Sequence, residues 1–332
     1  MKKILIIGCG SIGKRHLSNF VEVGGCEIVG ADSREDRLQE IKDQYGVEKT
    51  YTDYLEALKN ESIDGVVVAC PPHIHVKVCN DALDHGCHLF VEKPLAHDLE
   101  GVQELADRCK ELNKVGFVAY CHRFIPYSQK FKEIIESGQI GKPVTIRMEW
   151  GSYLPDWHPW EDYRTFYMAK KEQGGGALLD ESHGVDLLRW WFGEVQSVSA
   201  IIDQVSDLEI SSDDVAALLL RFKSGAVATA NFDLCRREPK IFVEVIGTEG
   251  MASWDRMQHE IKCYSAEKKT WETMNFTKDD LMGMYPSETE HFLNCIDGKE
   301  ESLVDLHDGA KTMGILVGAF ESTESGARVQ LP

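Results

Sequence analysis

Short apolar runs alternate with helical stretches through the first third of the chain. The runs are short and continuous enough for buried parallel strands, and they occupy residues 4–7, 28–30, 66–69, 89–91 and 116–120. The stretches between them have helical spacing and occupy residues 13–23, 34–45, 54–59, 75–85 and 99–112. Alternating strands and helices predict an α/β domain with a doubly wound parallel sheet.

The pattern changes near residue 120. After a predicted helix at 127–137 and a turn at 138–143, longer alternating strands follow at 144–150, 198–205, 215–222, 226–234 and 241–246. Consecutive alternating strands predict an α+β domain with a large, mostly antiparallel, open-faced sheet, with helices at 182–191, 286–297 and 306–321. The chain has 332 residues, which at about 150 residues per domain predicts two domains, residues 1–120 and 121–332.

Composition narrows the range of partners. Lys and Arg number 36 against 55 Asp and Glu, which gives a net charge of −19. Because this charge repels phosphate backbones and anionic lipids, we expect neither nucleic-acid nor membrane partners. No apolar run approaches the roughly 20 residues of a membrane span, and the first apolar run reaches glycine too early for a signal peptide. We therefore expect a cytoplasmic protein.

The cysteines and histidines do not predict a metal site. Ten cysteines are scattered without a CxxC pair, so we expect reduced thiols. His73 and His75 form an HxH pair without a third ligand at a recognisable spacing. No metal is expected.

A glycine-rich motif follows the first predicted strand. Gly8, Gly10 and Gly13 fit GxGxxG at the point where a strand gives way to a helix. In this context the first glycine allows a tight turn, the second lets backbone approach a pyrophosphate, and the third allows close packing of helix and strand. The motif predicts a Rossmann nucleotide site; a glycine-rich turn without a ligand is the alternative.

Asp32 follows the second predicted strand, 19 residues beyond Gly13. A carboxylate at this point accepts hydrogen bonds from an adenosine ribose and repels a 2′-phosphate, which favours NAD over NADP. Ser33 and Arg34, which come next, are the residues that would hold such a phosphate if NADP were used.

Four further segments resemble one enzyme family. They are Cys70-Pro71-Pro72-His73-Ile74-His75, the segment 86–96 with Glu92-Lys93-Pro94, Cys121-His122-Arg123-Phe124, and the segment 174–186 from Gly174-Gly175-Gly176 to Asp186. In this order, together with GxGxxG, they resemble the Gfo/Idh/MocA family of sugar and cyclitol oxidoreductases. The resemblance covers nearly the whole chain. It departs from the family pattern at Pro72, where Asn is frequent, and in the Asp180 to His183 spacing of three residues instead of four.

The resemblance implies a set of site residues. The implied cofactor contacts are Gly8, Gly10, Ser11, Ile12, Gly13, Asp32, Ser33, Arg34, Cys70, Pro71, His75, Glu92, Lys93 and Arg123. The implied catalytic residues are Lys93, His183 and Asp180.

Oxidation of a secondary alcohol needs a hydride acceptor, which the nicotinamide supplies, and a group that takes the hydroxyl proton. Lys93 lies at the end of a parallel strand, where burial beside a cationic nicotinamide lowers a lysine pKa. His183 is the other candidate base, with Asp180 or Asp186 to orient it. Alternatively, Asp180 is the N-cap of the following helix and Asp186 pairs with Arg189 on the helix surface.

An aromatic segment at 153–164 is the candidate sugar site. Aromatic faces beside polar groups suit a sugar ring, and an arginine can hold a carboxylate or phosphate. The predicted substrate contacts are Tyr153, Trp157, Tyr163 and Arg164, together with Lys93, Asp180 and His183. A packed structural loop or a dimer contact is the alternative for this segment. Trp190 and Trp191 are expected in a helix core.

The residues together predict an NAD-dependent dehydrogenase acting on a hydroxyl of a sugar, a sugar derivative, possibly nucleotide-linked, or a cyclitol. A second hypothesis uses the same site for transient oxidation during glycosidic-bond elimination or epimerisation. A third is a non-catalytic NAD-sensing protein, which would need neither Lys93 nor His183. The apolar strands at 215–220 and 226–230 also predict a homodimer or homotetramer formed through the second sheet.

Overall fold

A computed structural model describes residues 1–157 and 159–332. The chain forms two compact units, the first made of Met1–Cys121 and Tyr285–Lys311, the second of His122–Met284 and Thr312–Pro332. The first division falls one residue after the predicted boundary. The return of residues 285–311 to the first unit differs from the predicted division, in which every residue after 120 belonged to the second domain.

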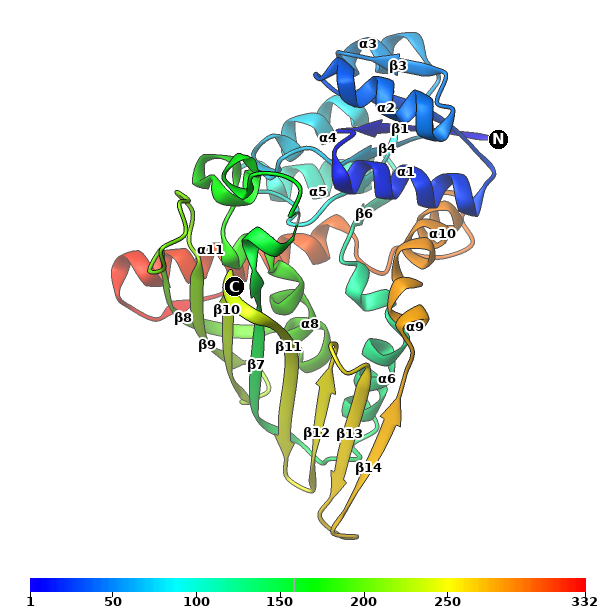
Figure 1. The fold of residues 1–332 in the computed structure, drawn as a ribbon. Helices are drawn as coiled ribbons and strands as arrows, with labels where there is room; N and C mark the ends of the chain where they lie inside the picture. Colours follow the sequence, from blue (N-terminus) through cyan, green and yellow to red (C-terminus); the bar gives the residue numbers. More distant parts are fainter. Residues whose placement is uncertain (158) are drawn as a thin grey trace. The chain divides into compact units, whose positions relative to one another are not determined.

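The first unit is built on a parallel sheet of six strands in the order β3-β2-β1-β4-β5-β6 (Figure 1). The strands are β1 Lys2–Ile7, β2 Cys26–Ala31, β3 Lys49–Tyr51, β4 Gly65–Val68, β5 His88–Val91 and β6 Gly116–Val118. The helices are α1 Ser11–Val23, α2 Glu35–Tyr45, α3 Tyr54–Asn60, α4 His75–Asp84 and α5 Val102–Glu111. The strand order reverses between β1 and β4, so this is the predicted doubly wound sheet, and such sheets bind ligands at the reversal.

Aromatic packing explains why a late helix belongs to the first unit. Helix α10, Met284–Ile296, places Phe292 against Phe90 of β5, with ring centroids 5.4 Å apart. Phe90 also packs on Phe117 at 5.0 Å, and Phe20 of α1 lies 6.4 Å from Phe292. All four rings are fully buried. This long-range contact has no local sequence signal, because an amphipathic helix does not specify which unit its apolar face covers.

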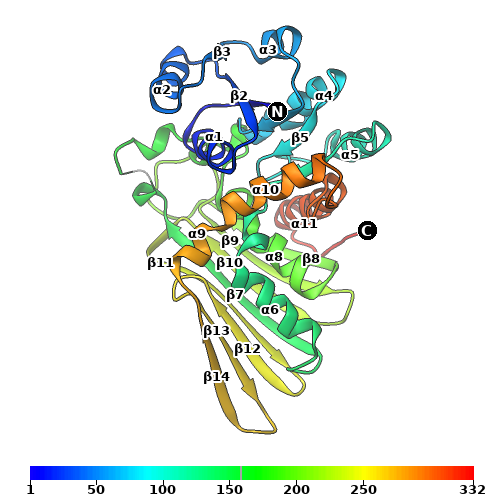
Figure 2. The same cartoon turned by 90° about the vertical axis from the view of Figure 1, so that its right-hand side faces the viewer.

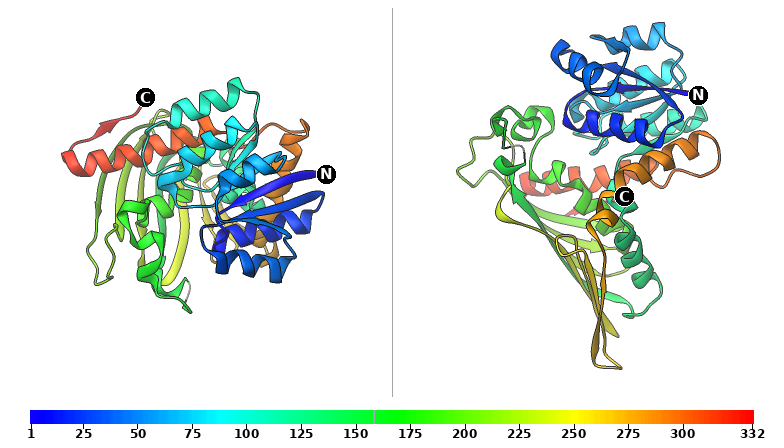
Figure 3. Two further views of the ribbon diagram at one scale, coloured as in Figure 1. Left: turned by 90° about the horizontal axis from the view of Figure 1, so that it is seen from above. Right: turned by 45° about the vertical axis from the view of Figure 1, so that its right-hand side comes forward.

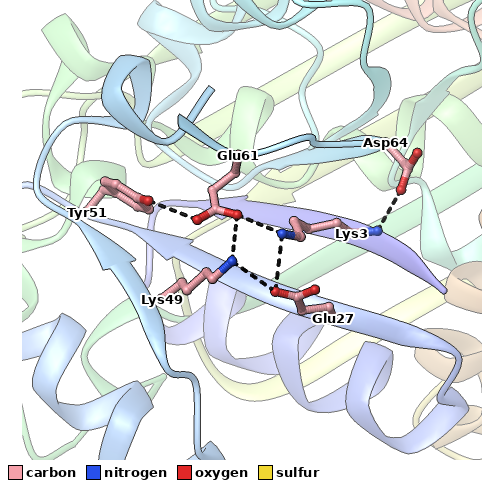
Figure 4. A network of polar contacts seen from close by, with 6 residues as sticks. All are labelled: Lys3, Glu27, Lys49, Tyr51, Glu61 and Asp64. Carbon is pink, nitrogen blue, oxygen red and sulfur yellow. Dashed lines mark hydrogen bonds and ion pairs between the residues drawn. The ribbon is translucent and has the colours of Figure 1, made fainter. Parts of the chain in front are cut away.

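A charged network crosses β1, β2 and β3 on one side of the sheet (Figure 4). Glu61, just beyond α3, accepts hydrogen bonds from Lys3 Nζ at 2.7 Å, Lys49 Nζ at 2.8 Å and the Tyr51 hydroxyl at 3.0 Å. These donors lower the pKa of Glu61 to about 2. The network joins the short edge strand β3 to the rest of the sheet. This strand was not predicted, because it has only three residues, one exposed and two partly exposed.

The second unit contains a sheet of nine strands in the order β14-β13-β12-β11-β7-β10-β9-β8-β15 (Figure 2; further views in Figure 3). The strands are β7 Pro143–Tyr153, β8 Val195–Asp203, β9 Val215–Phe222, β10 Val227–Asp233, β11 Cys235–Gly247, β12 Gly250–Asp255, β13 Glu260–Ser265, β14 Thr270–Asn275 and β15 Val329–Gln330. Among the described strands of this second sheet, only the β7 and β10 pair is parallel. The predicted mostly antiparallel sheet is confirmed.

Helices cover one face of the second sheet (Figure 2). They are α6 Pro126–Glu136, α8 Ser182–Phe192, α9 Lys278–Met282 and the later part of α11 Leu306–Ser325. Gly184 of α8 shows how closely helix and sheet approach, because an added Cβ would lie 2.5 Å from the Phe232 ring on β10. Trp191 is buried and donates its Nε1–H to the Ser128 carbonyl at 3.0 Å, as expected for helix core, whereas Trp190 is partly exposed.

Strands β12, β13 and β14 were not predicted. Their apolar side chains alternate with polar ones over only six residues each, and β14 is exposed at five of its six positions. All ten cysteines are free thiols. Among the residues that the structure describes, no helix has both the length and the apolar run needed to cross a membrane.

Candidate cofactor and catalytic sites

The glycine loop joins β1 to α1 with backbone packed too tightly for side chains. Gly8 has a φ of +94°, and an added Cβ there would lie 2.5 Å from the Ala69 carbonyl oxygen. A Cβ on Gly13 would lie 1.8 Å from the Gly8 carbonyl oxygen. Gly10 is the N-cap of α1 and provides no side-chain cap. The first N–H groups of the helix, including those of Ser11 and Ile12, therefore have no acceptor in the preceding turn, which fits a pyrophosphate.

Asp32 follows β2 and is 8% exposed. Its Oδ2 accepts the Cys9 N–H at 2.8 Å and contacts Arg37 Nη1 at 3.3 Å, while Oδ1 accepts the Arg34 N–H at 2.9 Å. Each carboxylate oxygen has two lone pairs, so Oδ1 keeps one for a ribose hydroxyl. The arrangement fits NAD. Ser33 is exposed.

Two arginines lie beside this carboxylate. The Arg34 guanidinium is directed to Asp36, with Nε 3.0 Å from Oδ1. Arg37, which we did not single out from the sequence, contacts Asp32 and lies over Gly10, where an added Cβ would be 3.5 Å from its Nη1. Arg37 lies five residues after Asp32, and a helix begins between them. No sequence pattern at this spacing predicts that the two side chains meet.

The loops that follow β4 and β5 are tied together by His75. Its Nε2 lies 2.7 Å from the Cys70 carbonyl oxygen and its Nδ1 lies 3.1 Å from the Pro94 carbonyl oxygen. The ring is fully buried, and burial lowers its pKa. Burial also raises the pKa of the Cys70 thiol to about 12, so the thiol is neutral. Pro71 is the N-cap of the short helix η1, Pro72–Ile74. His75 thus fixes the two loops that carry Cys70 and Pro94.

Glu92 and Lys93 follow β5 at the carboxyl end of the sheet. Glu92 is 7% exposed, its Oε2 accepts the Lys93 N–H at 3.0 Å, and its Oε1 lies 2.6 Å from His16 Nε2. Burial alone would raise the pKa of Glu92, but the hydrogen bond with His16 and the charges of His16 and Lys93 lower it overall. The Glu92 carboxylate thereby holds the backbone at Lys93. Lys93 itself is partly exposed.

A second buried carboxyl lies behind this pair. Glu288 of α10 is fully buried, and its Oε1 is 4.0 Å from His16 Nδ1. Burial and the nearby charge of Glu92 raise the pKa of Glu288 well above its ordinary value, which favours its protonated form. Sequence patterns did not identify His16 or Glu288, since they come from helices distant along the chain.

In the second unit, Asp180 and His183 lie on consecutive short helices, α7 Ala177–Asp180 and α8. Asp180 is 4% exposed and accepts the Tyr167 hydroxyl at 2.5 Å between oxygens. His183 is 9% exposed and stacks on His122, with ring centroids 4.3 Å apart and planes within 4°. His122 in turn stacks on Trp150 at 5.2 Å. The α8 N-cap is Glu181, so the alternative role of Asp180 as its N-cap is wrong.

Arg123 and Asp186 form a buried ion pair. Arg123 Nε and Nη2 donate to the two Asp186 carboxylate oxygens at 2.8 and 2.6 Å, and both residues are at most 2% exposed. Asp186 also accepts the Thr312 hydroxyl at 3.3 Å. Arg189 donates to Glu194 at 2.9 and 3.1 Å. The alternative pairing of Asp186 with Arg189 on the helix surface is therefore wrong. Arg123, predicted as a cofactor contact, makes this ion pair within the second unit.

The aromatic segment is organised by contacts of its own. Trp157 donates its Nε1–H to the Ser152 hydroxyl at 2.7 Å, and the Arg237 guanidinium lies 3.5 Å from the Tyr153 ring centre. Arg164 donates to Asp162 at 2.9 Å and to Glu209 at 2.6 Å, and both raise its pKa further. Tyr163 accepts the Glu209 N–H at 3.2 Å. Arg164 thus already has two carboxylate partners. His158 of this segment lies outside the described residues.

Two family models match nearly the whole length of the chain. Residues 2–120 match the family described as "Oxidoreductase family, NAD-binding Rossmann fold", and residues 132–331 match "Oxidoreductase family, C-terminal alpha/beta domain" of the same Gfo/Idh/MocA group. The chain belongs to the Gfo/Idh/MocA oxidoreductase family. The predicted resemblance, the NAD cofactor and the class of NAD(P)-dependent dehydrogenase are thereby confirmed.

Individual relatives match over almost all of their length. The chain is 29% identical over 340 residues to the myo-inositol 2-dehydrogenase of Thermotoga maritima, covering 99% of this chain and 98% of that one. It is 28% identical over 338 residues to the scyllo-inositol 2-dehydrogenase (NAD(+)) of Bacillus subtilis, covering 98% and 95%.

A solved structure confirms the fold. The WlbA dehydrogenase from Bordetella pertussis, in complex with NADH and UDP-GlcNAcA, is similar with a TM-score of 0.86 and 24% identity, over 100% of this chain and 99% of that one. At this identity the similarity establishes the fold alone.

Proposed function

We propose that the protein transfers a hydride between a secondary hydroxyl of a sugar, a sugar derivative or a cyclitol and the nicotinamide of NAD. The observation that carries the proposal is the position of Lys93, held through its backbone by the buried Glu92 at the carboxyl end of β5. In doubly wound sheets this edge faces the ligand. The two inositol dehydrogenases that match over nearly the full length support a polyol substrate.

Lys93 is proposed as the proton-transfer residue. When bound, NAD supplies the acceptor for the hydride that leaves the carbinol carbon. The hydroxyl proton leaves separately, and Lys93 in its neutral form accepts it at Nζ. The positive charge of an oxidised nicotinamide bound beside Lys93 would favour that neutral form. The reaction therefore releases one ketone, one reduced cofactor and one proton for each alcohol consumed.

His183 and Asp180 are proposed to bind and orient the reacting hydroxyl. The His183 ring stacks on the parallel face of His122, and this contact orients its ring plane. A neutral imidazole can accept a proton or hydrogen bond from a hydroxyl. Should Lys93 not be the base, His183 takes that role.

The test is a substrate panel of sugars, sugar acids, nucleotide sugars and inositols with purified protein and NAD. Appearance of NADH absorbance with at least one polyol is the expected result, and NADP should support a slower reaction. If no panel member yields NADH and none is bound after purification, the dehydrogenase proposal fails. Incorporation of solvent deuterium into a sugar without net NADH would instead identify the transient redox cycle.

A further inference from the structure

His16 connects the cofactor-binding helix to the loop that carries Lys93. It lies on α1, whose first N–H groups fit a pyrophosphate, and its side chain is fully buried. Its Nε2 lies 2.6 Å from Glu92 Oε1, and its ring packs against Phe90 of β5 with centroids 4.8 Å apart. Because Glu92 directly precedes Lys93, this single contact joins α1 to the backbone of the proposed proton-transfer residue.

The Glu92 carboxylate is held by one donor on each oxygen. Burial raises the pKa of Glu92, but the hydrogen bond with His16 and the charges of His16 and Lys93 lower it overall. An ionised carboxylate can only accept hydrogen bonds, so His16 Nε2 is the donor to Oε1. The other oxygen, Oε2, accepts the Lys93 N–H at 3.0 Å. The two bonds together fix the plane of the carboxylate and, with it, the direction of the Lys93 N–H.

Glu288 lies on the other side of the His16 ring. Its Oε1 is 4.0 Å from Nδ1, which is longer than a hydrogen bond. Within the described part of the chain, His16 Nδ1 and both Glu288 carboxyl oxygens are buried and have no hydrogen-bond partner. Burial and the charge of Glu92 raise the pKa of Glu288 and so favour its protonated form. Between a protonated carboxyl and a charged one, an imidazole keeps its proton on the nitrogen that faces the charge, here Nε2.

The place of Glu288 in the core is unfavourable for stability. Burying a carboxyl without a hydrogen-bond partner costs free energy. Among the described residues, the titratable groups that face it are His16, Glu92 and Tyr285. Arg15, the nearby cation of α1, lies over the Tyr285 ring at 4.8 Å. A carboxyl kept in such surroundings indicates a role beyond packing.

We propose that His16 is a positioning residue of the dehydrogenase: its Nε2–H holds one oxygen of Glu92, so that the other oxygen holds the backbone of Lys93 in place for proton transfer. Protonated Glu288 behind the ring keeps the His16 proton on Nε2. This inference rests on the proposed function and adds to it a required link between α1 and the Lys93 loop. His16 acts only through Glu92 and exchanges no proton with substrate or cofactor in this role.

The test compares two amide substitutions that differ in reach. The amide nitrogen of His16→Gln lies about as far from the backbone as histidine Nε2 and can donate to Glu92, whereas that of His16→Asn reaches only as far as Nδ1. His16→Asn should lower kcat about 10- to 100-fold, because Lys93 is misplaced, while His16→Gln should retain most of kcat. KM for the polyol and the dissociation constant of NADH should change little in both, because glycine packing holds the start of α1. His85→Asn and His85→Gln, at an exposed position after α4, are the matched controls.

Steady-state kinetics and NADH binding separate failure of the inference from failure of the proposed function. If the parent protein neither binds nor oxidises any polyol, the proposed function fails and the inference with it. If the parent oxidises a polyol and His16→Asn keeps the parent kcat, only the inference is overturned. Equal losses in His16→Asn and His16→Gln, or a loss confined to NADH binding, would also overturn it.

Nitrogen NMR of protein with labelled histidine tests the position of the ring proton without turnover. The His16 ring of the parent, recognised by its absence from His16→Gln, should carry a proton on Nε2 that exchanges slowly with water. A His16 ring whose only proton is on Nδ1 cannot donate to Glu92. That result would overturn the inference whether or not His16→Asn folds.

Glu288→Gln tests the protonated carboxyl behind the ring. The folded-state pKa of Glu288 lies above its ordinary value of 4.5, so its contribution to stability is full below that pH and is lost as the pH rises toward the folded value. Glutamine loses no proton over this range. The denaturant midpoint of Glu288→Gln should therefore rise relative to the parent between pH 4 and pH 7, while that of the exposed Glu290→Gln should not. A difference between Glu288→Gln and the parent that does not vary with pH would overturn the role given to Glu288.

Discussion

At the residue scale, some of the residues that organise the sites have a local sequence signal and others do not. The glycines at 8, 10 and 13 and the carboxylate at 32 could be predicted, because their roles depend on spacing within one strand, turn and helix. The roles of three other residues could not be predicted, because each contacts its partner only in the folded chain. These pairs are His16 with Glu92, Tyr167 with Asp180, and Arg37 with Asp32. Such pairings depend on distances that no periodicity encodes.

Lys93→Met should retain NAD but lose most turnover. The change keeps the length and apolar stem of the side chain and removes the amine, and general acid–base catalysis contributes about 10²- to 10⁴-fold. We expect a loss of kcat in that range with little change in NAD affinity, measured by steady-state kinetics and cofactor fluorescence. The exposed Lys110→Met on α5 is the control. If kcat of Lys93→Met stays within a few-fold of the parent, Lys93 is not the proton-transfer residue, and His183 is the remaining candidate.

Asp32→Ala should weaken NAD and improve the relative use of NADP. The substitution removes the ribose acceptor and leaves Arg37, now without its carboxylate partner, as a positive charge beside the glycine loop. The expected loss for NAD is on the order of 1.5–3 kcal/mol, as for a charged hydrogen bond. Dissociation constants for NADH and NADPH measure it, with Asp43→Ala on α2 as control. If the parent and Asp32→Ala have equal dissociation constants for both cofactors, Asp32 does not contact the ribose.

At the scale of elements, apolar patterning identified the strands that are buried and missed those that are not. The five predicted strands of the first sheet are all present, while β3 and the hairpins of β12, β13 and β14 depend on pairing with neighbours already in place. Helix α10 was predicted, but its packing on Phe90 was not, because an amphipathic face fits any apolar surface of suitable shape.

The Glu61 network offers a test of how the edge strand is held. The pKa of Glu61 is lowered in the folded state to about 2, from its ordinary value of 4.5, so its contribution is complete above pH 4.5 and is lost as the pH falls toward 2. Glu61→Gln should therefore lower the free energy of unfolding by about 1–2 kcal/mol at neutral pH.

The Glu61→Gln difference should shrink below pH 4, where the parent begins to lose the same charge. Denaturant unfolding at several pH values measures it, and the exposed Glu56→Gln serves as the control. A difference that stays constant from pH 7 to pH 3 would show that the carboxylate charge of Glu61 does not contribute.

At the scale of the whole molecule, we predict assembly through the face of the second sheet that the helices leave uncovered. Ile201 of β8 is 71% exposed and Leu219 of β9 is 44% exposed, and the register places them on neighbouring rows of the paired strands. Exposed apolar side chains on a sheet favour burial against a second copy.

Analytical ultracentrifugation at micromolar concentration should give the mass of a dimer or tetramer. Combined Ile201→Glu and Leu219→Arg should shift the equilibrium toward monomer, because charged side chains would be buried in the interface. Val21→Arg, at an exposed position of α1, should leave the mass unchanged. A parent protein that sediments only as monomer would contradict the prediction.

The central claim is that this chain moves a hydride from a polyol carbon to NAD, and isotopic transfer tests it most directly. The best substrate of the panel is deuterated at the carbon that bears the oxidised hydroxyl. The reduced cofactor is then isolated, and its mass is measured by mass spectrometry. We predict one deuterium in each NADH formed in ordinary water, together with a slower reaction when hydride transfer limits the rate. Reduced cofactor without deuterium from that carbon would contradict the account.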